Sequence, residues 1–306
     1  MAIRMLKVLG LFLALHGYCL NPIVVVSIDG LRPDAIEKAN ATTLMRLINE
    51  GTSFSHATTV RPSLTLPAHT SMLTGLDPDQ HGIFWDEYLP SYGPVRFKTA
   101  LEIAHEHGFT TALIVAKEKL LHLNRPNSVD YFERTDKEGA QVALAFERYV
   151  SLSGLPNVTF LHLPDPDTKG HKHMWMSKAY LAGVRNADFA LTSIINTANA
   201  ASIERPIIIV TADHGGFGFG HMADIDANND IPFIAIGDNI AQGLIKQDRV
   251  TNYDIAPTIL SLLGLDIPED WAGKPAPITI NTSDTIMPMS LGKALFSSPY
   301  QANMSF

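Results

Sequence analysis

PIIIVTADHGGFGFGH, the stretch from Pro206 to His221, joins a run of apolar β-formers to an acid, two histidines and a glycine-rich turn. Its apolar residues, 207–210, do not alternate with polar ones, which is typical of a strand covered on both faces of a parallel sheet. Asp213 and His214 then lie at the carboxyl end of the strand, where open α/β sheets keep their ligand sites. An adjacent acid and imidazole on a glycine-rich turn can offer oxygen and nitrogen to one metal ion. The alternative is a polar turn after a core strand.

A second apolar run, Ile23 to Ile28 (IVVVSI), repeats this arrangement and ends in Asp29. A single aspartate after a strand is more often a turn residue or a helix cap than a metal ligand. Asp29 is therefore a candidate ligand only if other ligands converge on it.

A third strand pattern, from Asn157 to Leu163, runs into Asp167 and His171. These two residues are four apart, so one helical turn would place both side chains on the same side. A carboxylate and an imidazole at this spacing suit a borderline metal such as zinc. Asp165 and His173 are close enough in sequence to compete with them, and His173 reads better as a solvated or supporting residue.

The stretch from Arg61 to Gly75 reads RPSLTLPAHTSMLTG and predicts a helix that begins near Pro67 and ends at Thr74. Thr65 then lies at the helix N-terminus, where unpaired N–H groups favour an anion. A threonine there is usually a cap, unless metal ligands converge on it. Ser63 and Ser71 are competing hydroxyls that the local sequence does not exclude.

Strand patterns alternate with helical ones along the chain, which predicts a doubly wound, mostly parallel α/β sheet with helices on both faces. Further strands are expected over 110–115 and 231–236, and helices over 42–50, 97–107, 137–152, 177–199 and 253–263. No linker or repeat divides the chain, so residues 21–306 are expected to form a single domain.

Residues 1–20 have the layout of a secretory signal peptide, with Arg4 and Lys7 before a short aliphatic run. The run is too short for a lasting membrane anchor, and the alternative is a core helix. A signal peptide predicts a secreted or periplasmic protein, which suits a chain with one cysteine, Cys19. The net charge of −8, without a block of Lys and Arg, argues against binding a nucleic acid polymer.

The acids and histidines at the strand ends make a set of three carboxylates and three imidazoles: Asp29, Asp167, His171, Asp213, His214 and His221. Such a set can hold two ions with mixed nitrogen and oxygen ligation, which suits two zinc ions, although other divalent transition metals accept the same ligands. A pair of ions is suited to in-line displacement at phosphorus. Contact with such an ion would lower the pKa of the Thr65 hydroxyl and make it a usable nucleophile.

With these residues the sequence resembles the alkaline phosphatase superfamily, and most closely its nucleotide pyrophosphatase/phosphodiesterase branch. The matching segments span about two-thirds of the chain: SIDGLRPD from Ser27, RPSLTLPAHTSMLTGLDPDQHGI from Arg61, PDPDTKGH from Pro164, TADHGG from Thr211, the run 221–237 and, more weakly, YDIAPTILSLLGL from Tyr253.

The resemblance implies an alkaline phosphatase-like fold and a two-zinc hydrolase that cleaves phosphodiester or pyrophosphate bonds of a small substrate. Thr65 would be the nucleophile of a covalent phospho-threonine intermediate. One zinc would be held by Asp29, Asp213 and His214, and the other by Asp167, His171 and His221. His69 and His81 fall on recurrent family positions and read as structural or supporting residues.

Three departures from the branch bear on the substrate. Asp86 stands where an Asn contacts the phosphoryl oxygen, and a bare carboxylate would repel a phosphate unless it is protonated, paired or turned away. Leu66 replaces a base-stacking aromatic residue, although Trp85 could line the pocket. The spacing between His214 and His221 is short, with less material to shape a pocket.

These departures leave other functions open. A phosphomonoesterase or phosphonate hydrolase of the same superfamily would keep the metal site, and a catalytically impaired binding protein would keep the fold. A sulfatase is disfavoured because Thr65 stands where that branch needs a Cys or Ser. The oligomeric state is not predicted.

Overall fold

A computed structural model describes residues 21–135, 138–238 and 240–278, and the predicted signal peptide lies outside these residues. Its strands form one sheet in the order β4-β3-β5-β1-β6-β7-β2-β8. The strands are β1 (Ile23–Ile28), β2 (Thr52–Thr58), β3 (Thr111–Val115), β4 (Tyr131–Arg134), β5 (Val158–Leu163), β6 (Ile207–Thr211), β7 (Phe233–Ile236) and β8 (Leu244–Thr251).

The central strands β1, β5 and β6 are buried along their whole length, as their mostly apolar sequences predict. They are parallel to one another, and β3 and β4 continue the parallel order on one side. On the other side β7 pairs antiparallel with both β6 and β2, and β8 pairs parallel with β2. The sheet is thus mostly parallel, with β7 reversed.

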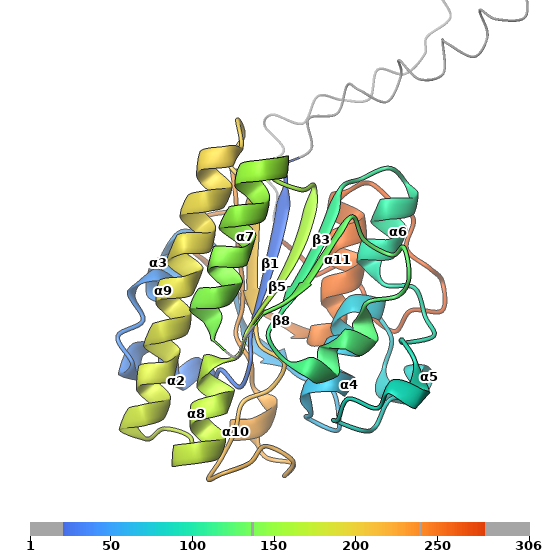
Figure 1. Cartoon of the computed structure of the whole chain (residues 1–306). Coiled ribbons are helices and arrows are strands. Elements are labelled where there is room, and N and C mark those ends of the chain that lie inside the picture. The colour runs from blue at the N-terminus through green and yellow to red at the C-terminus, as the bar shows by residue number, and fades with distance from the viewer. Residues whose placement is uncertain (1–20, 136–137, 239, 279–306) are drawn as a thin grey trace, which may run out of the picture.

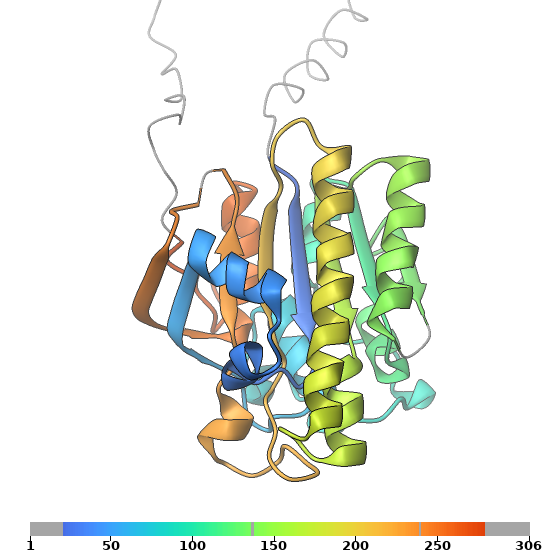
Figure 2. The same ribbon diagram turned by 90° about the vertical axis from the view of Figure 1, so that its left-hand side faces the viewer.

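Helices cover both faces of this sheet, as Figures 1 and 2 show. In Figure 2, α3, α7 and α9 stand in front of the sheet, whereas α4, α6 and α11 pack together on the opposite face. The helices are α2 (Pro33–Lys38), α3 (Thr42–Glu50), α4 (Thr65–Thr74), α5 (Pro78–His81), α6 (Ala100–Glu106), α7 (Gly139–Ser153), α8 (Asp165–His173), α9 (Lys178–Ala201), α10 (Asp226–Asn229) and α11 (Ile255–Leu262), with short 3-10 turns η1 (Pro90–Tyr92), η2 (Glu118–Leu123) and η3 (Asn252–Asp254).

The doubly wound, mostly parallel sheet predicted from the sequence is confirmed. The sequence patterns did not indicate β2, β4 and β8, which lack the apolar runs of the inner strands. β8 lies at the edge of the sheet, and its exposed positions include the charged Asp248 and Arg249. Charged side chains are common on edge strands because they discourage pairing with another chain.

Helix α4 is fixed at its C-terminus by the segment that follows α11. Gly75 ends the helix with φ at +69°, and its carbonyl accepts a hydrogen bond from the N–H of Gly273 at 2.9 Å. The ring of Trp271 lies against Gly75, so that a Cβ built there would come within 2.4 Å of the indole. This contact fixes the helix whose first residue is Thr65.

We expect Gly75→Ala to destabilise the protein by roughly 2 to 4 kcal/mol, from the left-handed backbone and the clash with Trp271 together. Gly82→Ala is the matched control, because Gly82 has φ at +73° but nothing within 4 Å of its Cβ position. That variant should lose only about 1 to 2 kcal/mol. Chemical denaturation measures both, and equal losses would contradict the packing role of Trp271.

Candidate metal centre and nucleophile

Three aspartates meet at the carboxyl edge of the sheet. Ser27 of β1 lies level with Thr211 of β6, so that Asp29 and Asp213, each two residues further on, emerge side by side. Asp167 lies in the first turn of α8 and is tied to this edge by a 3.0 Å hydrogen bond from its N–H to the carbonyl of Asp29. In Figure 1 this is the lower end of the sheet, where α8 lies.

Each aspartate has one oxygen held and the other free. Asp213 Oδ1 accepts hydrogen bonds from the N–H groups of Gly30 and His214, at 3.0 and 2.9 Å. Asp29 Oδ2 and Asp167 Oδ2 are both in contact with the ammonium group of Lys117. The remaining oxygens, Asp29 Oδ1, Asp167 Oδ1 and Asp213 Oδ2, are buried and have no hydrogen-bond partner.

Three histidines present one nitrogen each to the same place. Nδ1 of His214 donates to the carbonyl of Gly215 at 2.8 Å, that of His221 to Ser63 at 2.5 Å, and that of His171 to Phe219 at 2.9 Å. A carbonyl can only accept, so in each neutral ring the proton is on Nδ1 and the Nε2 lone pair is free. Burial, with the neighbouring His214, lowers the pKa of His221 to about 3, which keeps that ring neutral.

The free atoms form two overlapping groups: Asp29, Asp213 and His214 in one, Asp167, His214 and His221 in the other. His171 joins the second group, because its Nε2 lies 3.3 Å from Asp167 Oδ1 and 3.2 Å from His221 Nε2. The six residues predicted as ligands are therefore together, with His214 between the two groups.

This donor set fits divalent cations. Buried carboxylate oxygens and imidazole lone pairs that face one another repel unless a cation lies between them. Burial and the charge of Asp29 raise the pKa of Asp213 to about 7. This direction is the one that repulsion between neighbouring carboxylates produces. Nitrogen and oxygen donors held from behind by hydrogen bonds are the arrangement of metal sites.

Thr65 lies beside this set as the first residue of α4, after the N-cap residue Leu64. Its Oγ1 accepts a hydrogen bond from Lys117 Nζ at 3.2 Å. The two competing hydroxyls are engaged within the fold: Ser63 donates to the carbonyl of His221, and Ser71 pairs with His81 at 3.0 Å.

Lys117 and His162 are site residues that the sequence analysis missed. Lys117, directly before η2, places Nζ 2.7 Å from Asp29 Oδ2 and 2.5 Å from Asp167 Oδ2. His162 of β5 contacts Asp29 Oδ2 at 2.7 Å through Nε2. Although burial opposes it, the charge of Lys117 and the His162 hydrogen bond hold the pKa of Asp29 well below its usual range.

Asp86 is paired. Its Oδ1 accepts a hydrogen bond from the N–H of Leu66 at 2.8 Å, and its Oδ2 lies 2.6 Å from Lys119 Nζ. A carboxylate at this position is compatible with a bound phosphate if it is protonated, paired or turned away. In the structure Asp86 is paired. Lys119 lies on the same turn as Lys117, and nothing in the local sequence links it to Asp86.

A pocket of about 510 Å³ opens over the histidines and is lined by Leu64, Trp85, Asp86, Glu87, His171, Gly220, His221 and Met222. Trp85 and Asp86, both expected near the substrate, are thus in its wall. Leu66 is fully buried in the core, so its side chain does not line this pocket.

His69 and His81 are used inside the fold. His69 donates from Nδ1 to the carbonyl of Thr65 at 2.8 Å and contacts the Ser27 hydroxyl at 2.9 Å through Nε2. Nδ1 of His81 accepts from the N–H of Ile83 at 3.1 Å. Neither ring therefore has a free nitrogen for a metal.

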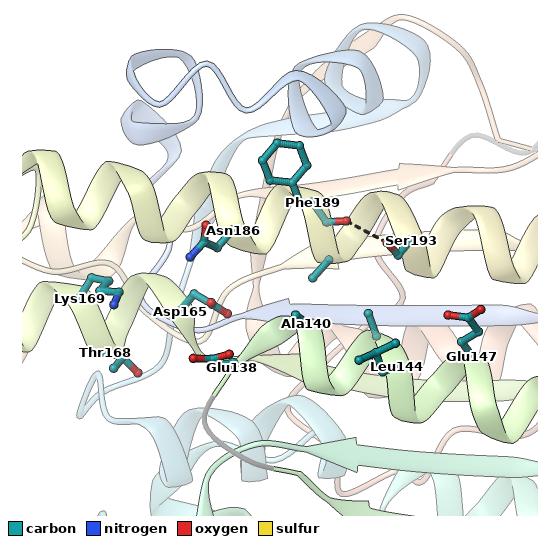
Figure 3. A pocket seen from close by; sticks show the side chains of 12 residues that line it. Glu138, Ala140, Leu144, Glu147, Asp165, Thr168, Lys169, Asn186, Phe189 and Ser193 are labelled. Atoms are coloured by element: carbon teal, nitrogen blue, oxygen red, sulfur yellow. Dashed lines mark hydrogen bonds between the residues drawn. The ribbon is translucent and has the colours of Figure 1, made fainter.

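Asp165 lies in a different place from Asp167. It lines a groove of about 610 Å³ between α7 and α9. Figure 3 shows it there, together with Lys169 and Glu138. Its Oδ2 accepts a 2.7 Å hydrogen bond from the N–H of Gly139. His173 is exposed at the end of α8. Neither residue competes with Asp167 and His171 for the site.

Comparison with known proteins gives the family. The model of the family described as type I phosphodiesterase / nucleotide pyrophosphatase matches residues 23–103 and 115–230, which is more than half of the chain. This chain belongs to the type I phosphodiesterase / nucleotide pyrophosphatase family. The resemblance stated from the sequence motifs is thereby confirmed.

Relatives of this phosphodiesterase-family chain carry several activities in their names. A 2,3-bisphosphoglycerate-independent phosphoglycerate mutase of Cronobacter sakazakii is 26% identical over 52% of this chain and 30% of the mutase. A bis(5'-adenosyl)-triphosphatase of Xenopus laevis is 21% identical over 81% of this chain and 61% of that protein. The chain thus spans less than two thirds of the length of these relatives.

Among solved structures, murine ectonucleotide pyrophosphatase/phosphodiesterase 5 has the same fold. Its inactive threonine-to-alanine variant in complex with AMP superposes with a TM-score of 0.68 at 15% identity, over 81% of this chain and 96% of that one. Within the described part of this family member, no helix is both long and apolar enough to span a membrane.

The environment of Asp165 predicts a pH dependence of stability. Burial raises its pKa to about 6, so the carboxyl ionises at higher pH in the folded protein than in the unfolded chain. The folded state is then favoured while Asp165 is protonated, and stability falls as the pH rises from about 4 to 6. A gap of about two pKa units corresponds to at most about 3 kcal/mol.

Asp165→Asn cannot ionise, so its stability relative to wild type should rise over this pH window. Denaturant titrations between pH 4 and 8 measure the difference, and Asp266→Asn, at an exposed position, is the control. A constant offset across the window would show that Asp165 is not responsible.

Proposed function

We propose that this protein is a two-metal hydrolase that cleaves phosphodiester or pyrophosphate bonds, with Thr65 as the nucleophile. The observation that carries the proposal is the convergence of oxygen and nitrogen atoms from three aspartates and three histidines beside the Thr65 hydroxyl. The family supports it, and so does the structural neighbour that is inactive when a threonine is replaced by alanine.

Asp29, Asp213 and His214 would hold one ion, and Asp167, His171 and His221 the other. Zinc suits this mixture of nitrogen and oxygen donors, although manganese, cobalt or iron can bind the same residues. When bound, such ions supply positive charge that polarises a phosphoryl oxygen and makes a nearby hydroxyl more acidic.

In the proposed reaction, Thr65 Oγ1 gives up its proton to solvent and attacks phosphorus. The bond to the leaving oxygen breaks with its electron pair on that oxygen, which takes up a proton from solvent, and the phosphoryl group remains on Thr65. Water then cleaves the phospho-threonine ester, which restores the hydroxyl and releases phosphate or a phosphate monoester. His69 receives no proton in this scheme; its bond to the Thr65 carbonyl orients the first turn of α4.

The substrate would be a small phosphate ester that binds in the pocket between Trp85 and Met222. A monoester or phosphonate is the second candidate. A bare carboxylate at Asp86 would repel a dianionic monoester more than a diester, but Asp86 is paired with Lys119. The same pairing also weakens the charge argument for a catalytically impaired binding protein. We also propose a secreted or periplasmic location, on the basis of residues 1–20.

The substrate class is decided by initial rates on aryl phosphodiester, phosphomonoester, phosphonate and sulfate substrates with one common leaving group. A phosphodiesterase should show its highest kcat/KM on the diester. A large preference for the monoester would instead support a phosphomonoesterase.

Thr65→Ala should keep its bound metal and lose on the order of a thousand-fold or more in kcat, because the attacking oxygen is removed. Thr74→Ala, at the other end of the same helix, removes a buried hydroxyl that bonds only to the Thr70 carbonyl and should keep its turnover. Steady-state kinetics and metal analysis test both variants, and turnover in Thr65→Ala would exclude Thr65 as nucleophile.

Metal removal should abolish hydrolysis and lower thermal stability, and added zinc should restore both. For a tightly bound ion the stabilisation amounts to roughly 5 to 15 °C in the unfolding temperature. Asp213→Asn removes a ligand oxygen and should lose most of this shift, whereas Asp34→Asn, at an exposed carboxylate, should keep it. The same shift in both variants would refute the assignment of Asp213.

A further inference from the structure

Lys117 reaches the site from a strand that supplies no metal ligand. It follows β3 by two residues, and its side chain is 15% exposed. Its ammonium group has three N–H donors and three close partners: Asp29 Oδ2, Asp167 Oδ2 and Thr65 Oγ1. The two carboxylates fix the ammonium group, and the third donor points at the oxygen that would attack.

The lysine and the ligand set use different oxygens of the same carboxylates. Lys117 contacts the Oδ2 atoms of Asp29 and Asp167, whereas their Oδ1 atoms are the ones without a hydrogen-bond partner. Asp167 Oδ1 faces His171 Nε2 at 3.3 Å, and Asp29 Oδ1 faces His214 Nε2 at 3.7 Å. An ion bound through the Oδ1 atoms would therefore leave the contacts of Lys117 in place.

Two other donors in this region, the N–H of Leu66 and the ammonium group of Lys119, are engaged by Asp86. The N–H of Leu66 donates to Asp86 Oδ1, and Lys119 is held by Asp86 Oδ2. Within the described part of the chain, Lys117 is the positively charged residue in contact with Thr65 Oγ1. A phosphorus atom bonded to Oγ1 would bring its nonbridging oxygens next to that hydroxyl, within reach of the same donor.

We propose that Lys117 is a catalytic residue whose ammonium group binds a nonbridging oxygen of the phosphoryl group that Thr65 attacks. The proposal rests on the function proposed above and adds a residue to it. Negative charge grows on these oxygens during transfer, so a fixed cation stabilises the transition state more than the ground state.

Lys117→Met tests this proposal, with Lys98→Met as the matched control. Lys98 is also a lysine in an ion pair, with Glu106 at 2.6 Å, but it is 51% exposed and outside the site. We expect Lys117→Met to lower kcat roughly 100- to 1,000-fold, the usual effect of losing one donor to a developing oxyanion. Lys117→Arg keeps the charge but not the shape and should recover part of the loss.

Two further measurements separate catalysis from structural support. Metal analysis should find equal metal in wild type and Lys117→Met. Calorimetry with inorganic phosphate, on proteins of equal metal content, should show binding weakened at least about ten-fold in Lys117→Met. Lys98→Met should match wild type in both measurements. If Lys117→Met does not fold, Lys117→Gln, which loses the charge, is judged by the same criteria.

Wild-type kcat and phosphate affinity in the lysine variant would overturn the proposal. So would a loss that coincides with lost metal and is fully reversed by added metal, because Lys117 would then only position Asp29 and Asp167. If the wild-type protein cleaves no phosphate or phosphonate ester, the proposed hydrolase function fails, while the phosphate titration still decides whether Lys117 binds the anion.

Discussion

The constraint on which the rest of this structure depends is the burial of three carboxylates at one edge of one sheet. Asp29, Asp167 and Asp213 are almost fully excluded from solvent, and a buried charge is tolerated only when it is paired or bound to metal. The fold brings them together through strand register and one backbone hydrogen bond, from Asp167 to Asp29. Their repulsion is therefore built into the architecture, and cations must offset it.

Neutral hydrogen-bond donors and one ammonium group, that of Lys117, offset part of this repulsion. Backbone amides, His162 and Lys117 hold one oxygen of each aspartate, while the other oxygen faces the histidines. The imidazoles are oriented in the same manner, by backbone carbonyls on their Nδ1 atoms. Each of these candidate ligands thus keeps one atom in a fixed direction, which is the preorganisation that a metal site requires. Burying Lys117 among the acids leaves a permanent cation beside Thr65.

The parts of this arrangement that local patterns encode could be predicted. Mostly apolar runs identify β1, β5 and β6, and an acid follows each run at the same edge of the sheet. The missed parts depend on contacts between distant segments. Lys117 looks like any lysine after a strand, and His162 like a polar interruption of β5, until the neighbouring strand ends are known. β2 and β8 were missed because strands near an edge need no continuous apolar run. Asp165 and Asp167 are both aspartates in the first turn of α8. The geometry of this turn places Asp167 at the site and Asp165 in the groove between α7 and α9.

For the proposed function, the pairing of Asp86 with Lys119 changes which phosphate esters the pocket could distinguish. An asparagine amide would offer a neutral donor whose direction matters, whereas an ammonium group acts as a point charge with little directional preference. Because Coulomb attraction scales with charge, lysines near the transferred group favour more negative groups over less negative ones. Asp86 limits this effect by neutralising Lys119 while holding the first turn of α4 through Leu66. Selection among phosphate esters would then depend on the balance between Lys117, held toward Thr65, and Lys119, held away from it by Asp86.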